Sequence, residues 1–220
     1  MVERSVAECV WRDLGRIEYG AALELQRELV ERRKRDEIGD QLLFVEHPHV
    51  ITLGRNGKRE HLLGGEGIAF YETDRGGDIT YHGPGQLVGY PIVDLKLWKR
   101  DVVKYLRAME EVLIGALGEF GLEGEREAGM TGVWVRGAKV AAIGVHISRW
   151  VTSHGFALNV TTDLRYFQHI VPCGLTRPVT SMERLLGGDP GWERVRDAVA
   201  RQFGRVFERE MSEVEVLCQT

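Results

Sequence analysis

Residues 75–95 read RGGDITYHGPGQLVGYPIVDL, and they place a polar, glycine-rich segment directly before a continuous apolar run. Glycine reaches positive φ at little steric cost and proline fixes φ, so this density of the two residues dictates an unusual backbone path. Polar side chains recur along the segment at Arg75, Asp78, Thr80, Tyr81, His82 and Gln86. The run from Leu87 to Leu95 is typical of a buried strand. A rigid polar loop beside such a strand often forms a binding site, and a tight hairpin corner is the alternative.

Length and composition predict one soluble domain, residues 1–220, with a core of its own. The chain is 43% hydrophobic and 28% charged, and its formal net charge is -4 at pH 7. This charge gives no overall attraction to nucleic acid or to an anionic membrane. No stretch approaches the ~20 apolar residues of a membrane span, and the first twenty residues lack the apolar core of a signal peptide. We therefore expect a cytoplasmic protein with neither nucleic-acid nor membrane partners.

The hydrophobic pattern predicts an α+β fold, in which helices lie on one or two faces of a mixed or antiparallel sheet. Helical periodicity covers Tyr19–Glu37, Asp101–Phe120 and a segment from Asp189-Pro190 to about Glu208, and a short helix is expected within Ser181–Leu186. Strands are expected at 1–18, 41–46, 50–53, 68–72, 87–95, 132–135, 140–148, 151–160 and 214–217. Helices fall between groups of strands instead of alternating with each one, which is the α+β pattern.

Three finer expectations can be checked directly. Val102 and Val103 are expected in the apolar stripe of the helix at 101–120. Asp189 is the expected N-cap of the last helix, and Pro190 would be the first residue of that helix. Residues Arg136–Lys139 are expected to form a hairpin turn.

Of the three cysteines, only Cys173 has a local setting that suits chemistry. Cys9, Cys173 and Cys218 are odd in number and widely spaced, so neither a disulfide framework nor a zinc knuckle is predicted. Cys173 lies between Pro172 and Gly174, where the proline favours an extended chain and the glycine leaves room for a carbonyl group. A thiolate there would be a nucleophile. The alternative is an inert, buried cysteine.

Lys139 is the second candidate, because it directly precedes the apolar run Val140–Val145. Desolvation lowers the pKa of a lysine, which can then act as a base, and a charged lysine stabilises a thiolate. The alternative is an ordinary lysine at the edge of a turn. Gly144 and Gly155 would let a ligand approach the sheet closely, or else mark a bulge or a packing contact.

Metal binding is not predicted, although the chain has seven histidines: His47, His49, His61, His82, His146, His154 and His169. They form no HxH or HExxH motif on a helix.

Three blocks of sequence resemble the lipoyl (octanoyl) transferases, which begin protein lipoylation. The blocks are residues 75–86, residues 139–159 and residues 170–174, which contain Cys173. Their order and spacing match over nearly the whole chain, with one departure at His146, where a basic residue, often arginine, is expected. The resemblance implies the α+β fold shared with biotin and lipoate ligases.

The resemblance also implies a two-step acyl transfer. Cys173 would take the octanoyl group from octanoyl-acyl carrier protein as a thioester, and Lys139 would move the protons. A lysine of the acceptor would then form the amide, the acceptors being lipoyl domains of 2-oxoacid dehydrogenases and the glycine cleavage H protein. No cofactor, ATP or metal is implied, and a monomer is expected.

The family's acyl-binding residues map onto the first two blocks. They are Arg75, Gly76, Gly77, Asp78, Ile79, Thr80, Tyr81, His82, Ala142, Ile143, Gly144, Gly155, Phe156 and Ala157. Because the protein substrates of the family are typically acidic, a local basic patch is expected as well, with Arg55, Lys58, Arg59 and Arg149 as candidates.

Three other functions compete with this one. An ATP-dependent lipoate or biotin ligase would use Lys139 to bind an acyl-adenylate and would need no cysteine. A non-catalytic acyl- or partner-binding protein would bind its ligand with no covalent adduct. A metal-dependent hydrolase would depend on the histidines and would lose activity to a chelator.

Overall fold

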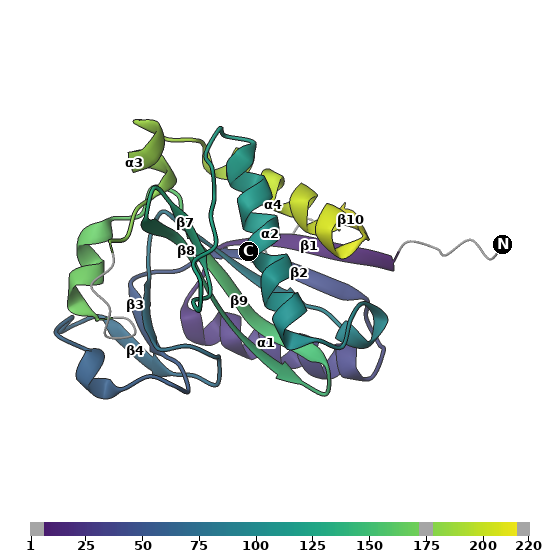
Figure 1. The fold of residues 1–220 in the computed structure, drawn as a ribbon. Helices are drawn as coiled ribbons and strands as arrows, with labels where there is room; N and C mark the ends of the chain where they lie inside the picture. The colour runs from purple at the N-terminus through teal and green to yellow at the C-terminus, as the bar shows by residue number, and fades with distance from the viewer. Residues whose placement is uncertain (1–6, 172–177, 215–220) are drawn as a thin grey trace, which may run out of the picture.

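The computed structural model describes residues 7–171 and 178–214, and within them the strands form two sheets (Figure 1). The larger sheet has the order β10-β1-β2-β6-β9-β8-β7. Its strands are β1 (Ala7–Arg16), β2 (Asp40–Glu46), β6 (Gln86–Ile92), β7 (Val133–Val135), β8 (Ala138–Ser148), β9 (Val151–Asn159) and β10 (Arg209–Glu213). Strand β1 is parallel to both neighbours, and the other pairs are antiparallel. The smaller sheet joins β4 (Ala69–Glu72), β3 (Val50–Leu53) and β5 (Ile79–His82).

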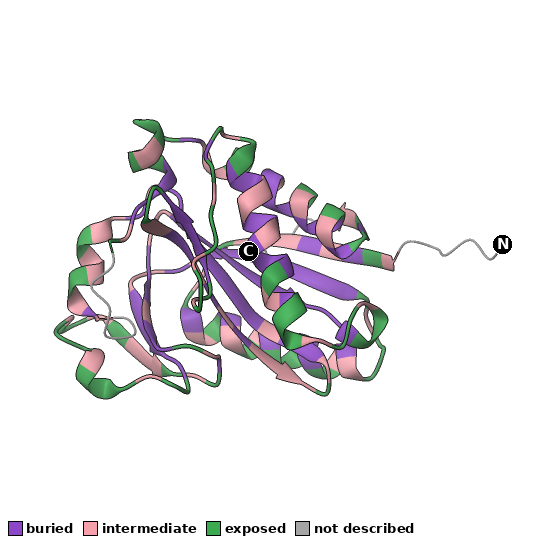
Figure 2. Cartoon of the chain, viewed as in Figure 1, coloured by how far each residue is buried: buried purple, intermediate pink, exposed green. Residues whose placement is uncertain are grey.

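Helices cover both faces of the larger sheet, which confirms the α+β prediction. Helix α1 (Tyr19–Lys34) covers one face, whereas α2 (Val102–Gly118) and α4 (Trp192–Phe207) cover the other. Successive residues of β2 serve opposite faces, as the two-residue period of a strand requires. Leu42 and Phe44 pack with the α2–α4 cluster, whereas Leu43 and Val45 pack with α1. Figure 2 shows the resulting buried centre between exposed outer helix faces.

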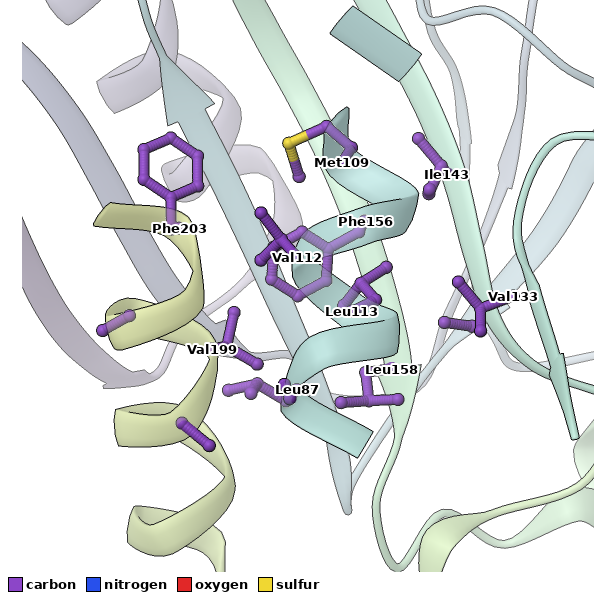
Figure 3. Packing of buried hydrophobic residues seen from close by; sticks show 14 of the residues in the cluster. Leu87, Met109, Val112, Leu113, Val133, Ile143, Phe156, Leu158, Val199 and Phe203 are labelled. Atoms are coloured by element: carbon purple, nitrogen blue, oxygen red, sulfur yellow. The ribbon is translucent and has the colours of Figure 1, made fainter. Parts of the chain in front are cut away.

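The core beneath α2 and α4 is aliphatic and aromatic (Figure 3). Met109, Val112 and Leu113 of α2 meet Phe156 and other residues of the central strands, and all four are nearly inaccessible to solvent. The predicted stripe of α2 is wrong in its first turn, because Val102 and Val103 are 44% and 66% exposed. The apolar stripe therefore continues one turn beyond the buried core.

The stretch 75–95 crosses from one sheet to the other. Residues Ile79–His82 form β5, which pairs with β3, whereas β6 pairs with β2 and β9. The hairpin-corner alternative is therefore wrong, and the expected polar loop contains a short strand. Strand β6 also ends at Ile92, three residues before the predicted Leu95, which instead begins a 3-10 turn capped by Asp94.

The hairpin before β8 is shorter than the sequence predicted. Only Arg136 and Gly137 turn, with φ of 52° and 76°, and this pair of positive φ values suits a two-residue hairpin. Ala138 and Lys139 already belong to β8. Lys139 therefore lies on a strand and not in a turn.

The carboxy-terminal elements differ from prediction at their boundaries. Helix α4 begins at Trp192 and not at Pro190, because the Asp189 carboxylate accepts a hydrogen bond from Gly191 N and closes a local turn instead. The last described strand, Arg209–Glu213, precedes the predicted strand at 214–217, and residues 215–220 lie outside the described residues. The short helix α3 (Met182–Leu186) confirms the prediction, and Ser181 caps it. Among the described residues, the helices are all too short or too polar to cross a membrane.

Candidate active site

A cavity of about 970 Å³ lies where the two sheets meet. The predicted acyl-binding residues from both sequence blocks line it, with one difference. Tyr81 is fully buried in the small-sheet core, where its hydroxyl group hydrogen-bonds to His49 Nδ1 at 2.7 Å. The fold therefore brings together residues 75–82 and residues 142–157, which lie far apart in the sequence, and leaves Tyr81 outside.

One wall of the cavity is apolar. Ala142 and Ile143 of β8 contribute to it together with Phe156 and Ala157 of β9, the strand paired beside it. Ile143 and Phe156 lie close to α2 in Figure 3. The exposed Val102 of α2 lines the same cavity. This wall suits an unbranched hydrocarbon chain, for which apolar burial is the main favourable term.

The segment at Arg75 is fixed against both sheets. The Arg75 Nη2 group donates to Thr52 O at 2.7 Å and to Thr52 Oγ1 at 2.9 Å, and Nη1 donates to Gly76 O. Gly76 N donates to Val145 O of β8 at 2.8 Å. The polar end of the cavity is therefore rigid, as the glycine-rich sequence suggested.

Gly144 and Gly155 line the cavity and also make room for the protein's own backbone. A Cβ atom on Gly144 would lie 2.9 Å from Gly76 O, and one on Gly155 would lie 2.1 Å from Gly89 O. Both distances are too short for a real Cβ atom. The expected packing contact is thus present at both residues, and their contact with a ligand stays a prediction.

A chain of hydrogen bonds links His82 to the backbone of Lys139. Thr180 N donates to Lys139 O at 2.9 Å, and Thr180 O accepts from Asn159 Nδ2 at 3.0 Å. The Asn159 Oδ1 atom must then accept from Gln86 Nε2, at 2.9 Å. Gln86 Oε1 is left to accept from His82 Nδ1, at 2.8 Å. Because an amide oxygen only accepts, His82 carries its proton on Nδ1 and a lone pair on Nε2.

Burial, together with the nearby His47, lowers the pKa of His82 to about 3. The ring is therefore neutral at physiological pH and lines the cavity as a hydrogen-bond acceptor. We refer to the series His82–Gln86–Asn159–Thr180–Lys139 as the relay.

A second polar group lies at the Arg75 end of the cavity. His154 Nε2 is 2.8 Å from Asp74 Oδ1, and His146 Nε2 is 3.6 Å from Asp74 Oδ2. Burial lowers the pKa of His154 although the carboxylate opposes the shift. His146, the residue that departs from the family pattern, thus faces the acidic side chain that precedes the Arg75 segment.

Lys139 lies at the opposite end of the cavity, half-buried on β8. Its Nζ atom is 4.7 Å from the centroid of the Trp134 ring. Its backbone N donates to Pro178 O at 2.9 Å. The backbone N and O of Lys139 are therefore hydrogen-bonded to Pro178 and Thr180, which follow residues 172–177 in the chain.

The chain before residue 172 is anchored at the same cavity. Val171 N donates to His61 O and Leu63 N donates to His169 O, both at 2.8 Å. Val171 and Pro178 both line the cavity. Cys173 itself lies outside the described residues, as does Cys218.

The structure also bears on two further candidates from the sequence, the thiol of Cys9 and a metal site. Cys9 is fully buried in the core, and burial raises the pKa of its thiol, so the inert alternative is correct there. Within the described part of the chain, histidine, cysteine and acidic residues form no group of three that could hold a metal ion.

The expected basic patch consists largely of ion pairs. Lys58 pairs with Glu60 at 3.3 Å, Arg59 with Glu72 at 2.7 Å and Arg149 with Glu31 at 3.3 Å. Arg55 lines the cavity instead.

Several lining residues were not assigned to the site from the sequence. They include Tyr19, Tyr90, Trp134, Asn159 and Val102. Tyr90 O–H donates to His47 Nε2 at 2.7 Å, because His47 Nδ1 donates to Ile17 O. Only Asn159 had a local signal, as a polar residue that ends an apolar strand; the others reach the cavity through tertiary packing alone.

Comparison with known proteins identifies the family. The model of the lipoyl protein ligase A/B catalytic domain matches residues 18–204. An octanoyltransferase of Solibacter usitatus is 59% identical over 209 residues, which cover 92% of this chain and 94% of that relative.

Solved structures with the same fold are more distant in sequence. A lipoate-protein ligase A bound with ATP superposes with a TM-score of 0.77 at 16% identity, covering 97% of this chain and 90% of its own. A biotin protein ligase from Aquifex aeolicus gives a TM-score of 0.55 at 11% identity, covering 91% of this chain and 69% of its own. These likenesses confirm the predicted biotin and lipoate ligase-like fold. The chain therefore belongs to the lipoyl protein ligase A/B catalytic domain family, and within it to the octanoyltransferases that act in protein lipoylation.

Proposed function

We propose that octanoyl transfer in this protein proceeds through a thioester on Cys173, with Lys139 as the group that moves the protons. One observation supports the pairing above the others. The segment that contains Cys173 starts and ends at residues lining the cavity, and the residues after it are hydrogen-bonded to Lys139 on both sides. The described residues on either side of that segment therefore lie at the cavity that Lys139 lines.

In the first step, Lys139 accepts the thiol proton of Cys173 while the sulfur attacks the carbonyl carbon of octanoyl-acyl carrier protein. A new carbon–sulfur bond forms, the carbon–sulfur bond to the carrier breaks, and the carrier thiolate regains the proton from Lys139. One thioester replaces another, so this exchange is nearly isoenergetic. A lysine is suited to the role because burial and neighbouring charges set its pKa.

In the second step, the amine of an acceptor lysine attacks the Cys173 thioester. The carbon–nitrogen bond of the amide forms, and the bond to Cys173 breaks. Lys139 accepts the amine proton and returns it to the Cys173 thiolate, which restores the enzyme. The conversion of a thioester to an amide runs downhill, so the proposed cycle needs no ATP, metal or other cofactor.

The cavity supplies the binding energy for the acyl chain. Burying the seven carbons beyond the carbonyl offers roughly 5 kcal/mol at ~0.8 kcal/mol per methylene, before the cost of ordering the chain. We propose that Ala142, Ile143, Phe156 and Ala157 contact the hydrocarbon, and that the Arg75–His82 segment closes the end away from Lys139. The lone pair on His82 Nε2 is available to accept a hydrogen bond inside the cavity.

The proposed acceptors are lipoyl domains, namely those of 2-oxoacid dehydrogenases and the glycine cleavage H protein. We propose a single-domain monomer that works in the cytoplasm with these partners. Sedimentation at several protein concentrations tests whether it is a monomer.

The decisive experiment is intact-mass spectrometry after the protein is mixed with octanoyl-acyl carrier protein in the absence of ATP and metal. We expect an octanoyl adduct that maps to Cys173 and disappears when a lipoyl domain is added. Cys173→Ala should give no adduct. If no adduct forms and an acyl-adenylate appears once ATP is supplied, the protein uses ligase chemistry and the proposed role of Cys173 is wrong.

A further inference from the structure

A basic and apolar surface lies at the amino-terminal end of α2, outside the cavity described above. Its members, all of them exposed, are Leu97, Lys99, Arg100, Val103, Lys104 and Arg107. Figure 2 shows exposed residues at this end of α2. Leu97 and Val103 are 64% and 66% exposed, although both are large aliphatic residues. We call this set the α2 entry patch. The set contains four cations in a chain of net charge -4, with Asp101 as the acidic residue beside Lys104.

Two of the four cations of this patch, Lys99 and Arg100, form no ion pair with a described carboxylate, and Lys99 Nζ lies 4.9 Å from the Trp98 ring centroid. The other two are paired: Lys104 is 3.6 Å from Asp101, and Arg107 Nη1 is 2.7 Å from Glu110 Oε2. Lys58 and Arg59 each have a carboxylate close by as well. Lys99 and Arg100 therefore offer positive charge to a partner at a lower cost in broken contacts than Lys58 and Arg59 do.

The patch is continuous with the cavity. Val102 and Leu106, which alternate with patch residues along α2, line the cavity itself. Further along α2, Glu110 Oε1 accepts from Gly132 N at 3.3 Å, and a Cβ atom on Gly132 would lie 3.4 Å from Lys139 Cε. The middle of α2 is therefore close to Lys139, and the patch lies about one to two helical turns before it.

This separation favours one class of partner over another. Val103 precedes Glu110 by seven residues, or ~10 Å along a helix that rises 1.5 Å per residue. An acceptor lysine has only a four-carbon stem, so the surface around it must come close to Lys139. A donor that carries its acyl group on a long prosthetic arm can bind at the patch and still deliver the thioester to the cavity.

We infer that the α2 entry patch is the docking surface for the acidic, acyl-carrying donor protein. Exposed aliphatic side chains beside Lys99 and Arg100, the two cations without an ion pair to a described carboxylate, match an acidic protein surface with an apolar centre, which is the composition expected at a protein interface. This inference rests on the proposed function, because it assigns a surface to that reaction's donor.

The test compares two double charge reversals of equal net change. Lys99→Glu with Arg100→Glu alters the patch, and Lys58→Glu with Arg59→Glu is the control on a different surface. Binding of octanoyl-acyl carrier protein is measured by calorimetry with Cys173→Ala added to every variant, so that no acylation accompanies binding. We expect the Kd of the patch variant to rise by about tenfold at low salt and that of the control by less than about twofold. The difference should shrink near 1 M salt, where the screening length is about 3 Å.

Acylation assays separate this inference from the proposed function. With the N-acetylcysteamine thioester of octanoate, a small donor, we expect both variants to react as fast as the unaltered protein. If the unaltered protein forms no Cys173 adduct, the proposed function fails while the binding test stands. If the patch variant binds the carrier protein normally, the docking inference is wrong. A rise in the Kd of a lipoyl domain alone would assign the patch to the acceptor and would also overturn it.

Discussion

Replacing Lys139 by alanine tests the chemistry with little risk to the fold. The backbone hydrogen bonds of Lys139 with Pro178 and Thr180 do not require its side chain, so alanine retains them. One contact that is lost is the cation–π contact with Trp134, at 4.7 Å. Such contacts contribute about 0.5–1 kcal/mol at partly exposed sites. For a chain of this size, we expect the melting temperature to fall by only about 2–4 °C.

The expected loss of activity is much larger. Removing a general base slows a reaction by about 10²–10⁴-fold, which corresponds to about 3–5 kcal/mol of transition-state stabilisation. The assay is single-turnover formation of the octanoyl-enzyme, followed by intact mass after rapid acid quenching. Thermal unfolding of the same preparation checks that the variant is folded.

Lys139→Arg is the matched control for charge. Arginine keeps a cation beside Trp134, but its pKa is too high for it to accept a proton near neutral pH. If Lys139 acts as a base, both variants lose acylation to a similar extent. If it only stabilises a thiolate by its charge, arginine restores most of the rate and the proton-transfer role is refuted. Normal turnover by the alanine variant would refute both roles.

Three further predictions follow from the packing and the relay. Gly155→Ala should destabilise the protein by about 1–3 kcal/mol in urea unfolding, because its Cβ atom would lie 2.1 Å from Gly89 O and force β6 and β9 apart; unchanged stability would contradict this packing. Asn159→Ala should remove the donor to Thr180 O and cost about 1–3 kcal/mol in urea unfolding, whereas Gln86 Nε2 keeps its bond to Tyr81 O at 3.3 Å; unchanged stability would contradict the contribution of Asn159 to the relay. Because the pKa of His82 is lowered to about 3 in the folded state, the unfolded chain binds more protons below its ordinary pKa of about 6.5. The contribution of neutral His82 to the free energy of unfolding is therefore complete above pH ~6.5 and falls by about 2 kcal/mol on going to pH 5. The free energy of unfolding in urea should depend less steeply on pH for His82→Gln than for the unaltered protein. Equal slopes for the two proteins would exclude the effect.

The sequence predicted the strongly periodic elements well. Helix α2 and strands β2, β8 and β9 were found because their apolar residues repeat at the periods of a helix or a buried strand. Strand β5 was missed because glycines flank it closely and three of its four residues carry polar groups. Its assignment depends on pairing with β3, a contact that no local pattern indicates.

The candidate site shows the same limit. Lys139 and the lining residues of both sequence blocks were named from the chain alone, but their roles in the fold were not. Gly144 and Gly155 were expected either to let a ligand approach or to make a packing contact, and the distances to Gly76 O and Gly89 O show the packing contact. Tyr81 was grouped with its neighbours, yet alternate residues of a strand face opposite sides, and it points into the small-sheet core.

The relay gives a physical reason why two distant sequence blocks belong to one site. His82 and Gln86 come from the segment that joins the sheets, whereas Lys139 is the second residue of β8 and Asn159 is the last residue of β9. Each side-chain amide in the relay has a single orientation, because Thr180 O can only accept a hydrogen bond. Asn159 must therefore turn its NH₂ group to Thr180 and its oxygen to Gln86, and Gln86 must turn its oxygen to His82. A change at Gln86 therefore acts at both ends, on the His82 tautomer and on the position of Thr180 against Lys139. The polar residues of the 75–86 block thus do more than contact an acyl chain: they also fix the backbone that leaves the segment containing Cys173.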